Sequence, residues 1–190
     1  MATVREGNQG VLLVVDVQVG VMEGAWDADR IIENIALAVE RARRHGVPVI
    51  WVQHTSKGLV RGSPTWQWAP ALAPADDEAL IHKRFNSSFE QTSLEETLAR
   101  LGATHIVLAG ASTNWCIRAT AYAALDRGYD LTLIEDAHTT GDIELEDDTV
   151  IKAADIVREL NIVMRWVRYP DRASSTAVAE EIDFAGLVGD

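Results

Sequence analysis

Continuous apolar runs recur along the chain, and amphipathic segments separate them. The runs occupy residues 10–15, 48–52, 79–82, 105–109, 130–134 and 162–166. Unbroken stretches of valine, isoleucine and leucine are typical of strands that are covered on both faces, as in a parallel sheet. The pattern therefore predicts six strands that alternate with helices around one sheet, which is an α/β fold.

Helical periodicity fills the intervals between these runs. Residues 30–45 place isoleucine, leucine, valine and alanine at helical spacing, and they end in Arg-Arg-His-Gly, with cations in the last turn and a glycine after it. Shorter patterns predict helices over residues 93–101, 115–127 and 147–160. The last of these precedes the sixth predicted strand.

Residues 56–77 show no regular pattern and contain Trp66 and Trp68. Loops of about 20 residues inside a compact domain are usually functional or disordered, and two tryptophans argue against disorder. We expect a lid or a contact between subunits, and the alternative is that the aromatic side chains pin the loop to its own domain. Together with the apolar tail over residues 177–190, the loop predicts a homo-oligomer, either a dimer or a tetramer.

Length and charge narrow the class of protein. The chain has 190 residues and 47% hydrophobic composition, which fits a single domain over residues 1–190. Its formal net charge of −12 disfavours nucleic acids and anionic membranes as partners. No stretch approaches the roughly 18 apolar residues of a membrane span, and the N-terminus does not resemble a signal peptide. We therefore expect a soluble, cytoplasmic protein.

Cys116 is the only cysteine, and it lies in the stretch GASTNWCIRAT between a predicted strand and a predicted helix. A lone cysteine excludes an internal disulfide and a cysteine-based zinc cluster. In an open parallel sheet, ligands bind beyond the carboxyl ends of the strands. This rule selects Asp16 after the first strand, Lys83 after the third and Cys116 after the fourth.

Each of the three residues also has a structural interpretation. Taken alone, an aspartate can be a turn residue, a lysine a solvated charge and a cysteine a small buried hydrophobe. Together they suit nucleophilic catalysis, because a helix N-terminus and a cation favour the reactive thiolate of Cys116. Asp16 would transfer the proton as acid and base, and Lys83 would hold Asp16 ionised.

Three motifs resemble one family, the isochorismatase-like cysteine hydrolases, which include nicotinamidases and ureidoacrylate and biuret amidohydrolases. The motifs are LLVVDVQ, HKRFNSSFEQTSL (with Ser88 where alanine is commoner) and LAGASTNWCIRATAYAALDRGYDLTLIEDA, and they span most of the chain. The resemblance implies a three-layer α-β-α sandwich, a Rossmann-like fold with a six-stranded parallel sheet. It implies that Asp16, Lys83 and Cys116 form a catalytic triad. It also implies a cis peptide bond between Ala111 and Ser112, with the N–H groups of Ser112 and Cys116 as an oxyanion hole.

The chain departs from nicotinamidases after the second strand. Those enzymes bind a metal there through an aspartate and histidines, whereas this sequence reads WVQHTSKG and has no Asp-x-His pattern. We therefore expect no metal and no cofactor, and a metal held between His54 and His82 is the alternative.

Family position and strand-end geometry predict a substrate pocket that is aromatic with a few polar groups. Without an obvious arginine clamp it suits a small neutral amide, but an inward-pointing Arg84 or Arg118 would favour a substrate with a carboxylate. The predicted pocket residues are Gln18, Trp26, His54, Trp66 or Trp68, Phe85, Phe89, Asn114 and Trp115.

These observations predict a hydrolase that cleaves a small amide or other C–N bond through a thioester on Cys116. One alternative is enol-ether hydrolysis of the isochorismatase kind, which needs Asp16 but not the thiol. Another is a catalytically silent, oligomeric relative. A phosphoacceptor receiver domain is disfavoured, because receivers need an acidic pair after the first strand and VVDVQVG supplies one acid.

Overall fold

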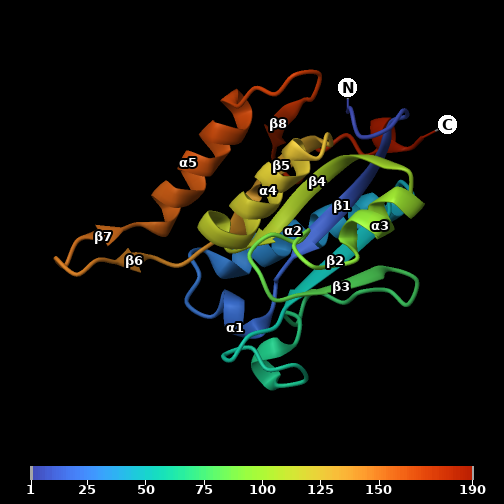
Figure 1. Ribbon diagram of the computed structural model, residues 1–190. Helices are drawn as coiled ribbons and strands as arrows, with labels where there is room; N and C mark the ends of the chain where they lie inside the picture. The colour runs from blue at the N-terminus through green and yellow to red at the C-terminus, as the bar shows by residue number, and fades with distance from the viewer. Residues whose placement is uncertain (1, 190) are drawn as a thin grey trace.

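Six parallel strands form the central sheet of the protein, which a computed structural model describes over residues 2–189 (Figure 1). All neighbouring strands pair in parallel, so the predicted α/β architecture is confirmed. In spatial order the strands are β3 (Ala79–Lys83), β2 (Val49–His54), β1 (Gln9–Val15), β4 (Ala103–Ala111), β5 (Asp130–Thr139) and β8 (Ser174–Ala177).

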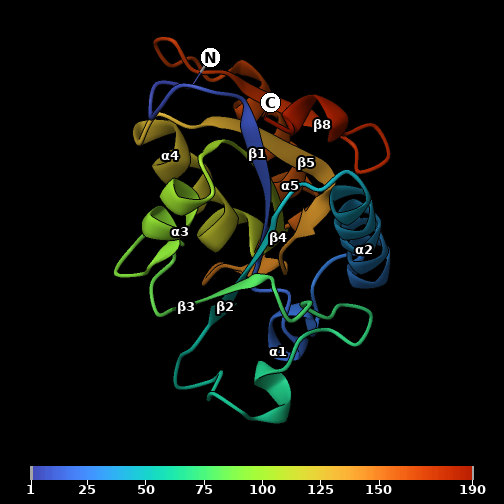
Figure 2. The ribbon, with the colours of Figure 1, turned by 90° about the vertical axis from the view of Figure 1, so that its right-hand side faces the viewer.

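Helices cover both faces of this sheet. Figure 2 shows α2 (Ala28–Arg44) on one side of the strands, and α3 (Leu94–Arg100) and α4 (Arg118–Asp126) on the other. Successive side chains of a strand point to opposite faces. Leu12 of β1 accordingly belongs to the core beneath α2, whereas Leu13 belongs to the core beneath α3 and α4. The molecule is the predicted three-layer sandwich.

The prediction of a strand over residues 162–166 is wrong, because these residues end the helix α5 (Ala153–Trp166). The helix buries Ile156, Leu160 and Met164, four residues apart, and exposes Ile162 and Trp166. The sixth strand is instead β8, a short run of small, mostly polar residues at the edge of the sheet that pairs only with β5.

The helix predicted over residues 147–160 also begins later than expected. Residues before it form a small hairpin of β6 (Ile143–Glu144) and β7 (Val150–Ile151), which projects from the body of the molecule beside α5 (Figure 1). The remaining short elements are α1 (Val19–Met22), η1 (Pro64–Trp66), the π-helix η2 (Thr113–Ile117) and η3 (Ala185–Leu187). Within residues 2–189, every helix is too short or too polar to cross a membrane.

The loop over residues 56–77 is held to its own domain by its aromatic side chains. The ring of Trp68 packs edge-on against the buried ring of Trp51, with 5.2 Å between centroids. The indole N–H of Trp66 donates to the Thr55 hydroxyl at 3.1 Å. These contacts favour the pinned loop over the lid.

The apolar tail is covered by the same chain. Ala179, Ile182 and Phe184 are buried in the core beneath α2. The Arg41 guanidinium donates to the carbonyl oxygens of Ala179 and Ile182 at 2.6 and 2.9 Å. These side chains are therefore not the partner surface that the sequence suggested, and oligomerisation stays a prediction.

Candidate active site

Asp16 lies directly after β1, at the carboxyl edge of the sheet. Its backbone has φ 54°, a left-handed conformation that non-glycine residues seldom adopt, and its N–H donates to the Val52 carbonyl at 2.8 Å. Strained conformations of this kind cluster at functional sites. The side chain is only 2% exposed. The carboxylate is thus fixed at the centre of the edge and shielded from water.

Lys83 ends β3 and points its ammonium at the same place. Its Nζ lies 2.6 Å from Asp16 Oδ2 and 3.1 Å from Cys116 Sγ. Two further neighbours are the Phe85 carbonyl at 3.1 Å and His54 Nδ1 at 3.3 Å. Removing both charges of a buried ion pair from water costs several kcal/mol per ion, so such pairs contribute little net stability. Its presence at a strand edge therefore indicates a functional site.

Cys116 lies in η2, the five-residue π-helix that follows β4. Gly110 makes this turn possible, because a Cβ there would lie 2.0 Å from the Val15 carbonyl oxygen, and its φ of +127° is open mainly to glycine. The Ala111–Ser112 peptide bond is cis. The Ser112 carbonyl then accepts the N–H groups of Trp115 and Ile117, both at 3.1 Å. π-helical turns are frequent at functional sites.

The protonation of the three groups differs from the sequence-based expectation. Burial, and then the negative charge of Asp16, raise the pKa of the Cys116 thiol to about 12, and the Lys83 ammonium opposes them. Burial also raises the pKa of Asp16, again against the effect of Lys83. Lys83 favours the thiolate, as the sequence predicted, but burial and the charge of Asp16 outweigh it, so the Cys116 thiol is protonated near pH 7.

Asp16 is free to take that proton. Apart from the ion pair with Lys83 and the contact with the Cys116 thiol, its carboxylate oxygens have no hydrogen-bond partner among residues 2–189. Buried acceptors with so few donors are rare outside functional sites. The resting site therefore holds a thiol beside a carboxylate that can accept its proton.

His54 closes one side of the triad. Burial, and then the Lys83 ammonium, lower its pKa, so the imidazole is neutral near pH 7. Because Nδ1 faces the Lys83 ammonium, which can only donate, the proton of the neutral ring lies on Nε2. The ring thus has one N–H left as a donor to another group.

Gln18 is near the triad, but main-chain groups occupy its side chain. Its Nε2 donates to the carbonyls of His54 and Trp66 at 3.1 and 3.0 Å, and its Oε1 accepts the His54 N–H at 2.8 Å. Gln53 Nε2 also donates to the Trp66 carbonyl, at 2.8 Å. This geometry supports a role for Gln18 in holding the loop against β2 rather than in contacting a substrate.

Three predicted pocket residues lie elsewhere. Phe89 is in the core, where its ring lies 6.1 Å from that of Tyr129 at the start of β5, because the chain after Lys83 turns back beneath α4. The ring of Trp68 is packed against Trp51. Trp26 precedes α2, and its ring lies beside the Arg30 guanidinium. The structure does not bring these side chains to the triad.

Phe85, Asn114 and Trp115 remain beside the triad. Phe85 supplies a carbonyl to Lys83 while its side chain is 46% exposed, and Trp115, next to Cys116, is 57% exposed. The Asn114 Oδ1 accepts the Thr140 hydroxyl at 2.7 Å. Two exposed aromatic residues are therefore close in the chain to Lys83 and Cys116.

The two arginines that would have favoured a carboxylate substrate differ in placement. Arg118 forms an ion pair with Glu159 of α5, on the outer side of the turn. Arg84 is exposed. Arg84 nevertheless lines a small cavity together with Lys83 and Phe85.

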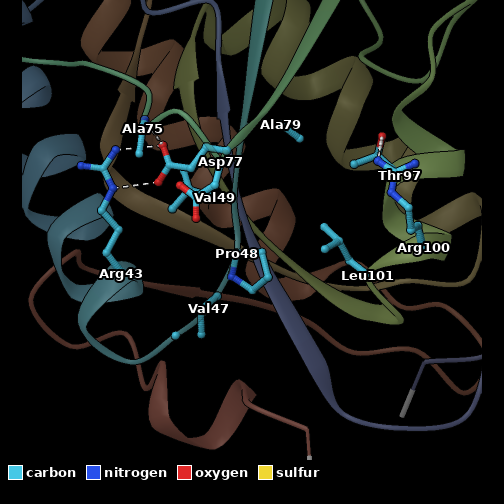
Figure 3. Close-up of a pocket in the computed structure, with 12 residues that line it drawn as sticks. Arg43, Val47, Pro48, Val49, Ala75, Asp77, Ala79, Thr97, Arg100 and Leu101 are labelled. Carbon is cyan, nitrogen blue, oxygen red and sulfur yellow. Dashed lines mark hydrogen bonds and ion pairs between the residues drawn. The ribbon is translucent and has the colours of Figure 1, made fainter.

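A cavity of about 570 Å³ lies away from this site (Figure 3). It is lined by the first residues of β2 and β3, including Val49 and Ala79, together with Arg43, Arg100 and Leu101. The triad is at the other end of the same strands, about 15 Å away for strands of five or six residues. The candidate site is therefore identified by the chemistry of Asp16, Lys83 and Cys116, and not by this cavity.

Comparisons with known proteins identify the family of the chain. A family model described as the isochorismatase domain matches residues 10–166. The chain belongs to the isochorismatase family. All three groups of the triad fall inside the part of the chain that this family model matches.

Streptothricin hydrolase of Streptomyces noursei is 34% identical over 139 residues, covering 70% of this chain and 55% of that protein. Maleamate amidohydrolase of Pseudomonas putida is 33% identical over 124 residues, covering 63% of this chain and 57% of that protein. The chain thus spans little more than half the length of these two isochorismatase-family relatives. The crystal structure of an isochorismatase from Pseudomonas putida KT2440 superimposes with a TM-score of 0.83 at 30% identity, over 92% of this chain and 90% of that one.

Two site features of this isochorismatase-family chain had no signal in the sequence. The first is the Phe85 carbonyl that binds Lys83, since a main-chain acceptor has no residue type. The second is the set of contacts around His54 and His82. His82 faces the Trp66 ring and Arg61, while His54 faces Lys83, so the two histidines do not converge. Among residues 2–189, no three His, Cys, Asp or Glu side chains gather as metal ligands would.

Proposed function

We propose that the protein is a hydrolase that cleaves a small amide or other C–N bond through a thioester on Cys116. The observation that supports this most directly is the position of Lys83 Nζ, within 2.6 Å of Asp16 Oδ2 and 3.1 Å of Cys116 Sγ. A nucleophile, an acid/base group and a cation meet there at the edge where parallel sheets bind ligands. Asp16, Lys83 and Cys116 are thus the proposed catalytic triad.

Acylation begins with proton transfer from the thiol to Asp16. With a pKa of about 12, the thiol is protonated near pH 7, so it needs a base at the moment of attack. The sulfur adds to the substrate carbonyl as the proton passes to the Asp16 carboxylate. When the tetrahedral intermediate collapses, Asp16 returns this proton to the leaving nitrogen, and ammonia or an amine departs from a thioester on Cys116.

Deacylation repeats these steps with water. Asp16 takes a proton from water as its oxygen adds to the thioester carbonyl, and it then reprotonates the departing sulfur, which releases a carboxylic acid. Lys83 stays paired with Asp16 whenever the carboxylate is charged. The proposed oxyanion donors are the N–H groups of Ser112 and Cys116. Within residues 2–189, the Ser112 N–H has no hydrogen-bond acceptor, which leaves it available for this role.

The surroundings favour a small, neutral, planar substrate. Phe85 and Trp115 offer exposed aromatic faces, and His54 offers one N–H donor. The relatives named above as a maleamate amidohydrolase and a streptothricin hydrolase support the amide class. We propose a primary amide, ureide or carbamate with a planar apolar portion.

The test is a panel of small amides, ureides and carbamates, maleamate among them, assayed for ammonia release. With a turned-over substrate, Cys116→Ala and Asp16→Asn are each expected to lower kcat by at least about 10³-fold, because each removes a group that forms or breaks a bond. Intact mass spectrometry with a slow substrate is expected to show one acyl group on the wild type. The same substrate is expected to leave Cys116→Ala unmodified.

Lys83→Met and the exposed Lys57→Met form a matched pair of charge removals. Only the first is expected to impair turnover. Full activity in Cys116→Ala, or the lack of an acyl adduct on a wild-type protein that releases ammonia, would refute the proposed nucleophile.

Enol-ether hydrolysis is a second candidate, because the matching family model carries the isochorismatase description and the thiol is protonated at rest. This reaction needs an acid such as Asp16 but no nucleophilic sulfur. An enol-ether substrate that is cleaved at the wild-type rate by Cys116→Ala and not by Asp16→Asn would favour it over the amidase.

A further inference from the structure

A second buried polar cluster lies on the inner side of the turn that holds Cys116. His138 of β5 is fully buried, and its Nδ1 lies 2.8 Å from the hydroxyl of Thr113, the first residue of η2. Its Nε2 lies 2.8 Å from Asn161 Oδ1 on α5. The Asn161 amide nitrogen donates to the Glu135 carbonyl at 2.8 Å. One imidazole therefore joins three elements of the fold.

The hydrogen bonds define which atoms are donors. A carbonyl oxygen only accepts, so the bond to Glu135 fixes the Asn161 amide nitrogen on that side and turns Oδ1 toward His138. Nε2 of His138 must then donate to Oδ1. In a neutral ring this leaves Nδ1 as an acceptor, and the Thr113 hydroxyl donates to it. Every group in the chain of bonds is satisfied in only this arrangement.

The backbone brings His138 to this position by a bulge in β5. Leu108 pairs with Leu133, and Gly110 pairs with His138, so two steps along β4 correspond to five along β5. The bulge places His138 beside Gly110, where β4 turns toward Cys116. Thr113 is itself fully buried, and it points away from the triad while Cys116, three residues later, points into it.

We propose that His138 is a positioning residue for the nucleophile, acting through the Thr113 hydroxyl on the turn, while Asn161 on α5 sets the tautomer in which Nδ1 accepts. The role rests on the proposed function in so far as Cys116 is the nucleophile. Nothing in the proposed reaction uses His138 as an acid or a base, and its ring is closed off from the triad by Thr113. What it supplies is a fixed separation between Cys116 and the pair formed by Asp16 and Lys83.

Two pairs of variants distinguish the hydrogen bond at His138 Nδ1 from the one at Nε2. The amide of His138→Asn reaches the position of Nδ1 and can still accept from Thr113, whereas that of His138→Gln reaches the position of Nε2 and keeps only the bond to Asn161. Thr113→Ser keeps the hydroxyl, and Thr113→Val removes it while keeping the branched shape. Thr104→Val is the control, since it removes a buried hydroxyl bond at the opposite end of β4.

The first readout is alkylation of the only cysteine by iodoacetamide at pH 8.5, which requires no substrate. A loosened turn frees the thiol from burial and from Asp16, and its pKa moves toward the ordinary value of about 8.5. Thr113→Val and His138→Gln are therefore expected to react about fivefold faster than the wild type or more. Thr113→Ser, His138→Asn and Thr104→Val are expected to stay within about twofold of the wild type.

The second readout is turnover of an amide that releases ammonia. Thr113→Val and His138→Gln are expected to lower kcat about tenfold or more with little change in KM, because substrate binding does not involve them. Unchanged alkylation in both would overturn the positioning role, as would equal acceleration in all five variants, which would indicate general loosening. If the wild type releases no ammonia from any amide, the proposed function fails while the alkylation series still decides the role of His138.

Discussion

At the scale of single residues, the protonation of the site is set by burial and by the charges of neighbouring side chains. Asp16 and Lys83 are almost fully buried as an ion pair, and this low-polarity setting keeps Cys116 protonated until a substrate arrives. The sequence was sufficient to select these three residues, because strand ends in a parallel sheet converge. It did not predict the charge state, since the balance between burial and a nearby cation depends on distances that residue order does not contain.

His138 provides a pH-dependent contribution to stability. Burial lowers its pKa to about 4, from an ordinary value of 6.5. Between these values the unfolded chain binds a proton that the folded chain does not, so the contribution of His138 to stability is fully present above pH 6.5 and is lost as the pH falls toward 4. At 1.36 kcal/mol per pH unit, the loss is about 3 kcal/mol. The hydrogen bond to Asn161 and the charge of Glu135 raise the pKa of His138, but by less than burial lowers it.

Urea unfolding at pH 7 and pH 4.5 measures this contribution. The fall in unfolding free energy between the two pH values is expected to be smaller in His138→Asn than in the wild type. His45→Asn, which changes an exposed histidine at the end of α2, is the matched control. Equal pH dependence in the wild type and His138→Asn would contradict the contribution.

At the scale of elements, the first five strands could be predicted because four are buried apolar runs between turn residues, and β3, whose burial alternates along the strand, still contains an apolar run. The sixth could not. β8 is four small residues at the sheet edge with little apolar signal, whereas residues 162–166 look like a strand because Ile162 and Trp166 are apolar but exposed on α5. The β5 bulge that positions His138 was equally invisible, because it depends on pairing with β4.

Gly110 is the element-scale position most sensitive to substitution. In Gly110→Ala the new Cβ would meet the Val15 carbonyl at 2.0 Å, and the positive φ would also be strained. We expect a loss of about 4 kcal/mol or more in unfolding free energy, or failure to fold, measured by urea unfolding. Gly58→Ala, where a Cβ would meet nothing within 4 Å, is expected to be neutral. A Gly110→Ala protein with wild-type stability would show that β1 and β4 can separate here at little cost.

At the scale of the whole molecule, the outer face of α5 exposes two large apolar side chains. Trp166 is 66% exposed and Ile162 is 51% exposed, one turn apart on α5. Exposed apolar patches on soluble proteins often mark contacts with other chains. This surface, rather than the buried tail, is the stronger remaining reason to expect a dimer or a tetramer.

Light scattering after gel filtration at micromolar concentration tests that expectation. The wild type is expected to elute as an oligomer and Trp166→Glu as a smaller species, because a charge would be buried in the contact. Val60→Glu places the same charge in the loop over residues 56–77, where Val60 is 58% exposed, and it separates a contact through the loop from one through α5. A monomeric wild type would contradict oligomerisation by either surface.

The hydrogen bonds of Gln18 and Gln53 affect how a substrate could reach Cys116. They join the end of β2 to the Trp66 carbonyl, and we expect them to hold the loop over residues 56–77 against the strand. We therefore expect this loop to stay in place during turnover. Under the proposed function, we expect substrate to enter and product to leave on the side of Cys116 away from this loop, where Phe85 and Trp115 are exposed. We therefore predict that Phe85 and Trp115, rather than motion of the loop, limit the size of the substrate that the proposed site admits.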